Sequence, residues 1–372
     1  MTRSRLEKLS QKLREHHIEH ALLCSLGSLR YFTGYSAVIE TGPSPFSPLM
    51  GVLFCEGNEK PALFLADMES SEGLEAELDL ETFASYTIEK PLAAVQDLTA
   101  KLLARLKKLP RSRVGMESEE LPAALLEPLR ASCPQLEFPD IASLLSEIRM
   151  VKDEEEVQAI REAVALCDLG QELAKKLARA GMSEVELFAE VRKGMEMQEG
   201  GRLPILVDMV SGPRTAQIGG PPSARRMEPG DLVISDLVPR HKGYWGDSCN
   251  TFVLGEPTAE NRLFFSGIAA ALQEGIEQVR PSLRACDLDA LLRKRVLQLQ
   301  GGYPHHSGHG LGVTWHEEPR IVPYNTLPLQ AGMIIALEPG IYFKERWGMR
   351  LEHVVRVTEK GREVLTKFKH TL

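Results

Sequence analysis

Four carboxylate residues, Asp236, Asp247, Glu338 and Glu352, interrupt segments that otherwise resemble apolar strands. A buried carboxylate is costly unless it is paired, hydrogen-bonded or bound to a metal ion. Asp236 and Asp247 flank a turn-like segment, residues 239–243. If the two runs form a hairpin with an even-length loop, their odd separation of 11 residues makes them a directly opposed pair on one face. Two opposed like charges destabilise each other unless a cation lies between them. A salt-bridged acid is the simpler interpretation of any one of these residues, but four together with a histidine cluster favour a chemical site.

The histidine cluster lies between the two pairs of carboxylates. Four of the ten histidines of the chain, His305, His306, His309 and His316, fall within twelve residues of a glycine-rich segment, where side chains can converge. Imidazole with carboxylates suits Zn, Mn, Fe or Co, and the absence of cysteine ligands argues against a structural zinc site. One histidine with four carboxylates carries a charge of about −4, which two divalent ions neutralise, as in a two-metal hydrolase. A water between such ions becomes a nucleophile. The alternative is that the clustered histidines are exposed loop residues without a chemical role.

The elements that position these residues follow from hydrophobic periodicity. The spacing of Val157, Ile160 and Val164 predicts a long helix over residues 153–180. Ser183 and Glu186 form a capping box that begins a second helix, which ends near residue 198. Further β-type runs lie at residues 205–211, 232–238 and 244–254, helices at 258–279 and 287–299, and final β-type runs at 333–337 and 349–358. Strands, then helices, then strands predict α+β packing with a curved antiparallel sheet.

The first 140 residues alternate short β-type runs with helical ones, which predicts an α/β layered domain. A length of 372 residues also argues for two domains. The boundary is expected just before the long charged helix, so we place the domains at residues 1–148 and 149–372.

The composition excludes several classes of protein. With a net charge of −8 and no long basic run, the chain is expected to bind neither nucleic acid nor a membrane surface. No segment approaches the roughly 18–20 apolar residues that a membrane span needs. The densely charged N-terminal segment has no features of an export signal, and the six scattered cysteines form no Cys-x-x-Cys pair. We therefore expect a cytoplasmic protein with reduced thiols.

Five motifs together resemble those of the pita-bread metallopeptidases, the family of Xaa-Pro dipeptidase (prolidase), aminopeptidase P, methionine aminopeptidase and the metal-free creatinase. In the family's order, the motifs are Asp236, Asp247, His309 in Gly308-His309-Gly310-Leu311-Gly312, Glu338 in Glu338-Pro339-Gly340-Ile341-Tyr342, and Glu352 in Arg350-Leu351-Glu352. Residues 29–35 resemble the signature of the creatinase-type N-terminal domain, and residues 149–156 are similar to the start of the family's catalytic domain. The resemblance implies a creatinase-type domain followed by a pita-bread catalytic domain, and it excludes the shorter methionine aminopeptidases.

Carried over residue by residue, the resemblance implies a ligand set for two divalent ions. Asp236 would bind one ion, His309 and Glu338 the other, and Asp247 and Glu352 would bridge both. Mn is the first expectation for the metal, with Co, Zn or Fe as alternatives. The resemblance also implies a homodimer.

The resemblance further implies catalytic roles. His305 and His316 match two histidines that contact the substrate and stabilise the tetrahedral intermediate, and Glu338 is the expected proton shuttle for attack by a metal-bridging hydroxide. We also assign Arg350 and Tyr244 to substrate binding. The substrate is expected to be a small peptide or another small molecule.

Three positions depart from the family pattern. Peptidases of the family carry a histidine 17 residues before the first aspartate ligand, and here that position is Gly219, so a group expected to donate to the substrate is missing. The usual arginine is replaced by Asn250, and the usual aspartate after the last ligand by His353. Restoring the histidine, by Gly219→His, is expected to raise peptide hydrolysis if its loss limits that activity.

Three hypotheses follow. The first is a two-metal exopeptidase of the Xaa-Pro dipeptidase or aminopeptidase P kind, which the complete ligand set and His305 and His316 favour. The second is a metal-dependent hydrolase or lyase of a small non-peptide substrate, which Gly219 favours. The third is a binding protein on an inactive scaffold, against which the complete ligand set argues.

Overall fold

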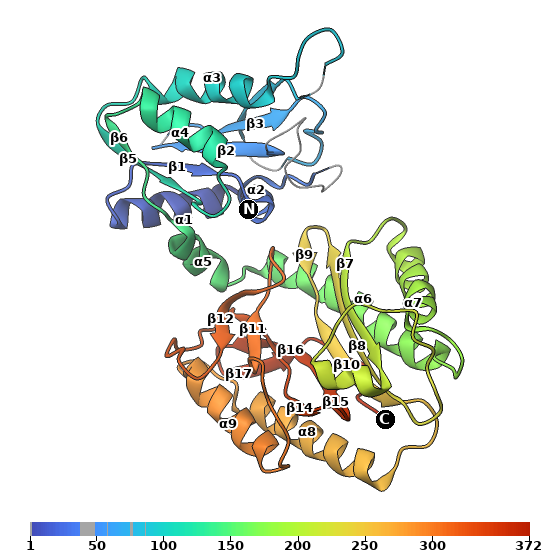
Figure 1. The fold of residues 1–372 in the computed structure, drawn as a ribbon. Coiled ribbons are helices and arrows are strands. Elements are labelled where there is room, and N and C mark those ends of the chain that lie inside the picture. Colours follow the sequence, from blue (N-terminus) through green and yellow to red (C-terminus); the bar gives the residue numbers. More distant parts are fainter. Residues whose placement is uncertain (1, 38–48, 58, 75–76, 86) are drawn as a thin grey trace. The chain divides into compact units, whose positions relative to one another are not determined.

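The computed structural model describes residues 2–37, 49–57, 59–74, 77–85 and 87–372. The chain divides into two compact units, Met1–Ile148 and Arg149–Leu372, each with its own hydrophobic core (Figure 1). Over the described ranges, no helix is both long enough and apolar enough to span a bilayer.

The first unit is an α/β layer structure, as expected. Its six-stranded sheet has the order β4-β3-β2-β1-β5-β6, antiparallel at the β1–β2 and β2–β3 pairs and parallel at the other three. Leu98, Leu102 and Leu106 recur at helical spacing on α3 and enter the core against the sheet. The elements are α1 (Thr2–Glu15), β1 (His20–Leu23), α2 (Leu26–Thr33), β2 (Gly51–Glu56), β3 (Ala62–Ala66), β4 (Asp79–Phe83), α3 (Ala94–Leu106), β5 (Ser112–Met116), α4 (Ala123–Ser132), β6 (Leu136–Glu137) and α5 (Ala142–Met150).

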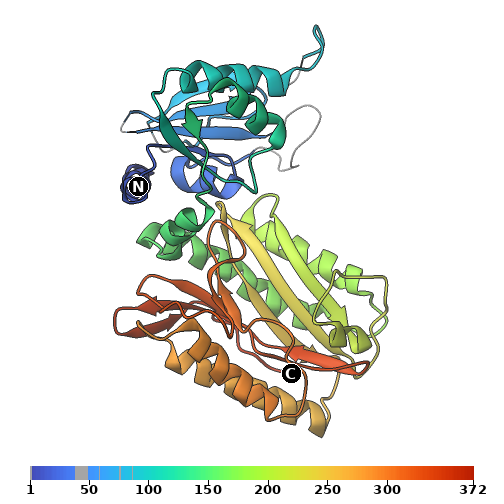
Figure 2. The same cartoon turned by 60° about the vertical axis from the view of Figure 1, so that its left-hand side comes forward.

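The second unit is α+β, and its strands lie between two pairs of helices (Figure 2). One sheet has the order β10-β8-β7 with β9 paired to β8, a second has the order β12-β11-β13-β16-β17, and β14 pairs with β15. The elements are α6 (Glu154–Leu177), α7 (Glu184–Glu199), β7 (Ile205–Ser211), the 3-10 helix η1 (Gly212–Gln217), β8 (Leu232–His241), β9 (Tyr244–Trp245), β10 (Ser248–Val253), α8 (Ala259–Gln278), α9 (Ala285–Leu297), β11 (Gly308–Gly310), β12 (Glu317–Ile321), β13 (Ile334–Leu337), β14 (Gly340–Phe343), β15 (Trp347–Arg350), β16 (His353–Thr358) and β17 (Gly361–Val364).

Helices α6 and α7 begin where capping residues place them. Asp153 and Glu156 form a capping box at the start of α6, and Ser183 and Glu186 form the expected one at the start of α7. Apolar residues of α6 and α7 pack against β7, β8 and β10, whereas α8 and α9 pack against the second sheet. The antiparallel sheets and the helical layers confirm the predicted fold class.

Two predicted strands are each divided at a carboxylate. The run 244–254 forms β9 and β10 with Gly246 and Asp247 between them, and the run 349–358 forms β15 and β16 with Leu351 and Glu352 between them. Glu338 also lies in a break, between β13 and β14. Three of the four carboxylates therefore sit at irregular backbone rather than inside a continuous strand, where the alternation of a pleated strand does not fix the direction of the side chain.

Candidate metal centre

The residues expected to bind metal come from strands β8 and β11 and from the strand breaks beside β10, β13 and β16. The backbone N–H of Glu352 donates to the Cys249 carbonyl at 2.9 Å, which ties the break before β16 to β10. His309 Nε2 lies 3.5 Å from Asp247 Oδ2 and 3.6 Å from Glu338 Oε1. Ligand atoms of Asp247, His309 and Glu352 all lie within 4.8 Å of one another. Residues more than 100 positions apart in the sequence thus form one cluster.

The strand register differs from the one expected for Asp236 and Asp247. In the β8–β10 pair Asp236 lies opposite Cys249, and Asp247 lies two residues before Cys249, in the break between β9 and β10. The predicted direct opposition is wrong because His241 pairs with Tyr244 and only Lys242 and Gly243 form the turn. The position of this two-residue turn shifts the register by two residues, so Cys249 and not Asp247 lies opposite Asp236.

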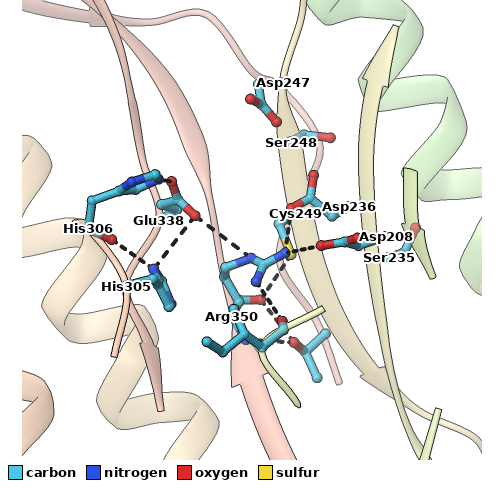
Figure 3. A network of polar contacts seen from close by, with 12 residues as sticks. Asp208, Ser235, Asp236, Asp247, Ser248, Cys249, His305, His306, Glu338 and Arg350 are labelled. Carbon is cyan, nitrogen blue, oxygen red and sulfur yellow. Dashed lines mark hydrogen bonds and ion pairs between the residues drawn. The ribbon is translucent and has the colours of Figure 1, made fainter. Parts of the chain in front are cut away.

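The carboxylate directly opposite Asp236 belongs to Asp208 of β7. Sequence reasoning missed Asp208, although it also interrupts an apolar strand, because the strand pairing that brings it to the site is not visible in the sequence. Arg350 Nη2 lies 2.5 Å from Asp236 Oδ2 and 3.4 Å from Asp208 Oδ2, so its guanidinium is the cation between the two opposed carboxylates (Figure 3). In the structure Arg350 therefore contacts the site acids, while its assignment to substrate binding stays a prediction.

His309 is oriented for metal binding by its neighbours. Its Nδ1–H donates to the Gly310 carbonyl at 2.9 Å, which leaves the Nε2 lone pair directed at the carboxylates. Gly308 and Gly310 have no side chains because there is no space for them. A Cβ on Gly308 would lie 2.0 Å from the Ala336 carbonyl oxygen, and one on Gly310 would lie 2.3 Å from that of Glu318. The close approach of β12 and β13 thus explains the glycines on both sides of His309.

His306 is a second residue that sequence reasoning left out of the site. Its Nε2 lies 2.7 Å from Glu338 Oε1, and its ring centroid is 5.3 Å from that of His309 and 5.2 Å from that of His316. His306, His309 and His316 form a second group of ligand atoms within 4.8 Å of one another. His316 itself is exposed at the edge of the cluster, with its ring 4.0 Å from the ring of His309.

His305 belongs to a chain of hydrogen bonds rather than to the ligand cluster. Arg350 Nη1 donates to the Tyr342 hydroxyl at 3.2 Å, this hydroxyl lies 3.1 Å from His305 Nε2, and His305 Nδ1–H donates to the His306 carbonyl at 2.7 Å. Burial lowers the pKa of His305 to about 4, so the ring is neutral at pH 7 and has a single N–H, which the carbonyl already takes. Here His305 accepts from Tyr342 and helps to hold Arg350 in place.

The carboxylates carry strongly shifted pKa values. Burial raises the pKa of Asp236 to about 6, an effect that Arg350 opposes and Asp208 reinforces. Burial, reinforced by neighbouring carboxylates, raises the pKa of both Asp247 and Glu352 well above the usual range. Burial acts in the same direction on Glu338, but the hydrogen bond from His306 and the nearby imidazoles outweigh it and lower its pKa. Without a cation between them, these groups cannot all be ionised at low cost.

The donor set fits divalent metal ions. Asp236 Oδ1 and Glu352 Oε2 are buried oxygens that have no hydrogen-bond partner among the described residues. An unpaired buried carboxylate oxygen is unfavourable unless a cation satisfies it. Carboxylate oxygens with one imidazole nitrogen suit Mn, Co, Zn or Fe.

Two departures from the family pattern meet at the C-terminal segment. His370 Nδ1 lies 3.0 Å from the Asn250 side-chain oxygen, its Nε2 lies 3.1 Å from the Glu352 carbonyl oxygen, and its ring centroid is 4.4 Å from that of His353. The replacements at positions 250 and 353 are therefore in contact with one another through His370, directly behind Glu352.

Tyr244 lies in β9, buried and paired with His241, and its assignment to substrate binding stays a prediction.

Comparison with known proteins gives matches over nearly the whole chain. Residues 158–359 match the model of metallopeptidase family M24, and residues 5–151 match that of the creatinase/prolidase N-terminal domain. The Xaa-Pro dipeptidase of Pyrococcus furiosus is 28% identical over 373 residues, which cover 100% of this chain and 99% of that protein. The crystal structure of the prolidase from Pyrococcus horikoshii superposes with a TM-score of 0.84 at 26% identity and covers 99% of each chain. That of an X-Pro aminopeptidase from Thermotoga maritima has the same fold, with a TM-score of 0.84 at 24% identity over 99% of this chain and 98% of its own.

Proposed function

The chain belongs to metallopeptidase family M24, and from this membership we propose that it is a metal-dependent exopeptidase acting on short Xaa-Pro peptides. The observation that supports this most strongly is the buried cluster of Asp247, His309 and Glu352, whose ligand atoms lie within 4.8 Å of one another. The similarity to an Xaa-Pro dipeptidase and to a prolidase structure over almost the full length supports the substrate class.

Five residues would hold two divalent ions, for which Mn is our first proposal: Asp236, Asp247, His309, Glu338 and Glu352. When bound, the ions supply a water of lowered pKa and polarise the scissile carbonyl. Glu338 is our proposed proton shuttle, a carboxylate that would accept a proton at an oxygen and return it to the leaving amine. The exposure of His316 beside His309 supports a role for His316 in contacting the substrate, whereas the N–H of His305 donates to the His306 carbonyl.

A second candidate is a hydrolase or lyase of a small non-peptide substrate on the same centre. Gly219 favours it, because the position that carries a histidine in the family's peptidases has no side chain here. The two candidates share the metal centre and differ in the substrate alone.

The deciding experiment measures turnover of Xaa-Pro dipeptides, Xaa-Pro-Xaa tripeptides and proline-free controls by metal-stripped protein, before and after addition of Mn, Co or Zn. Restored cleavage of the proline peptides establishes the peptidase, and the dipeptide-to-tripeptide ratio distinguishes prolidase from aminopeptidase P activity. Tight metal binding without cleavage of any peptide would favour the small-molecule enzyme. Asp247→Ala is the control, since it should abolish metal binding and activity together. The homodimer, expected from the family resemblance, is tested by sedimentation of the same preparation.

A further inference from the structure

Gly219 and Asp208 fit together as a pair. A Cβ placed on Gly219 would lie 1.9 Å from Asp208 Oδ2 and 2.6 Å from its Cγ, so the aspartate occupies the space in which a side chain at position 219 would begin. The backbone gives no separate reason for a glycine, because Ile218 and Gly220 have positive φ and Gly219 does not. The missing side chain at position 219 is therefore linked to the presence of a carboxylate on β7.

The carboxylate of Asp208 is the accessible one at this end of the site. Its side chain is 37% exposed, against 14% for Asp236 and 4% for Arg350. Arg350 lies much closer to Asp236, at 2.5 Å, than to Asp208, at 3.4 Å, and it also donates to the Ile218 carbonyl at 2.7 Å. The charge of Arg350 is thus mainly compensated by Asp236, and the Asp208 carboxylate remains a negatively charged acceptor for a ligand that binds beside Asp236.

We propose that Asp208 determines specificity at this centre. Its carboxylate fills the space left by Gly219, binds a cationic group of the substrate (a protonated amine or a guanidinium) and disfavours a substrate carboxylate. This inference rests on the proposed peptidase function and deepens it. A histidine at position 219 would offer a neutral or positive donor at the same place, so the exchange replaces a hydrogen-bond donor with a negatively charged acceptor. A carboxylate within a few ångströms of a charged ligand group changes its binding severalfold or more, even at the high effective dielectric of a partly exposed site.

The geometry also changes the expectation for Gly219→His. The new side chain can enter only if the Asp208 carboxylate rotates away from Arg350, so the single variant should not restore peptide hydrolysis by itself. The double variant Asp208→Ala/Gly219→His removes the overlap, and it should shift preference towards substrates with a free carboxylate.

The test uses Asp208→Asn, which keeps the shape and removes the charge, in the full-length Mn-loaded protein. The substrates are Ala-Pro and Ala-Pro amide, which differ in the terminal carboxylate, and Lys-Pro and norleucyl-Pro, which differ in a side-chain ammonium. We expect the wild-type preference for the amide over the acid, and for lysine over norleucine, to fall by about tenfold in the variant. Glu228→Gln removes the same charge from an exposed position in the same unit and should leave both ratios unchanged.

A binding measurement separates failure of this proposal from failure of the proposed function. Calorimetric dissociation constants of prolinamide and proline report the same charge preference whether or not any peptide is cleaved. Loss of the prolinamide preference in Asp208→Asn supports the proposal. The proposal is overturned if the amide-to-acid and lysine-to-norleucine ratios both stay within twofold of wild type. It is also overturned if Asp208→Asn weakens the binding of every ligand equally, since Asp208 would then only position Arg350.

Discussion

Asp247→Asn should stabilise the metal-free protein while abolishing metal binding. The side chain of Asp247 is 6% exposed, and its ligand atoms lie within 4.8 Å of those of Glu352. Two charges at that distance repel by about 3 kcal/mol at an effective dielectric of 20. Protonation limits this cost, because holding a carboxyl with an ordinary pKa near 3.9 protonated at pH 7 costs at most about 4 kcal/mol.

The sign of the pH dependence follows from the raised pKa of Asp247. A carboxyl whose pKa is higher in the folded state favours folding below its unfolded pKa, and this contribution is lost as the pH rises towards the folded value. The asparagine variant does not titrate, so its advantage should be absent near pH 4 and reach about 2–3 kcal/mol at pH 7. For a unit of this size that corresponds to a rise in Tm of about 5–10 °C.

The assay is thermal unfolding in the presence of a chelator at pH 4 and pH 7, repeated with added Mn. Asp289→Asn is the matched control, because Asp289 is equally buried but receives hydrogen bonds from Arg293 Nε at 2.9 Å and from the Ser307 hydroxyl at 2.7 Å. Removing that paired charge should lower stability by about 2 kcal/mol. With Mn present the order of wild type and Asp247→Asn should reverse. An Asp247→Asn protein that is less stable than wild type without metal at pH 7 would refute the reasoning.

Three further predictions concern the surroundings of the centre. His306→Leu removes the contact to Glu338 Oε1 and should weaken metal binding by about tenfold, measured by competition with a chelating dye; unchanged affinity would show that His306 does not support the centre. His370→Ala leaves the polar groups of Asn250 without their contact and should cost about 1–2 kcal/mol in urea unfolding, whereas an unchanged midpoint would show that the C-terminal contact contributes nothing. Chelation of the wild-type protein should lower its Tm at pH 7 more than at pH 5. At pH 7 the carboxylates left without a cation must take up protons at a cost, which is smaller at pH 5. Equal decreases in Tm at the two pH values would contradict the raised pKa of Asp236.

Much of the fold could be predicted because its signals are local. The capping boxes at Asp153 and Ser183 fix the starts of α6 and α7, and the spacing of Val157, Ile160 and Val164 fixes the buried face of α6. Strand positions could also be read from apolar runs, although the breaks beside Asp247 and Glu352 could not, since those breaks depend on how the two sheets meet.

The choice of candidate ligands was also predictable, because carboxylates in apolar strands and histidines in a glycine-rich segment are unusual in any context. Their pairing was not. The direct opposition expected for Asp236 and Asp247 fails by two residues, and Asp208 takes the opposing position instead. The position of the two-residue turn decides this register, and a polar turn-like segment does not reveal which of its residues stay paired.

The sequence by itself thus indicated the class of fold and the candidate residues for the metal centre, since both depend on residue type and short-range periodicity. The tertiary structure alone decided which carboxylate opposes Asp236, how Arg350 is shared and why Gly219 has no side chain. Those facts depend on contacts between segments more than a hundred residues apart or on the space between neighbouring strands. Packing between distant segments is a property of the assembled sheets, and no local sequence pattern predicts it.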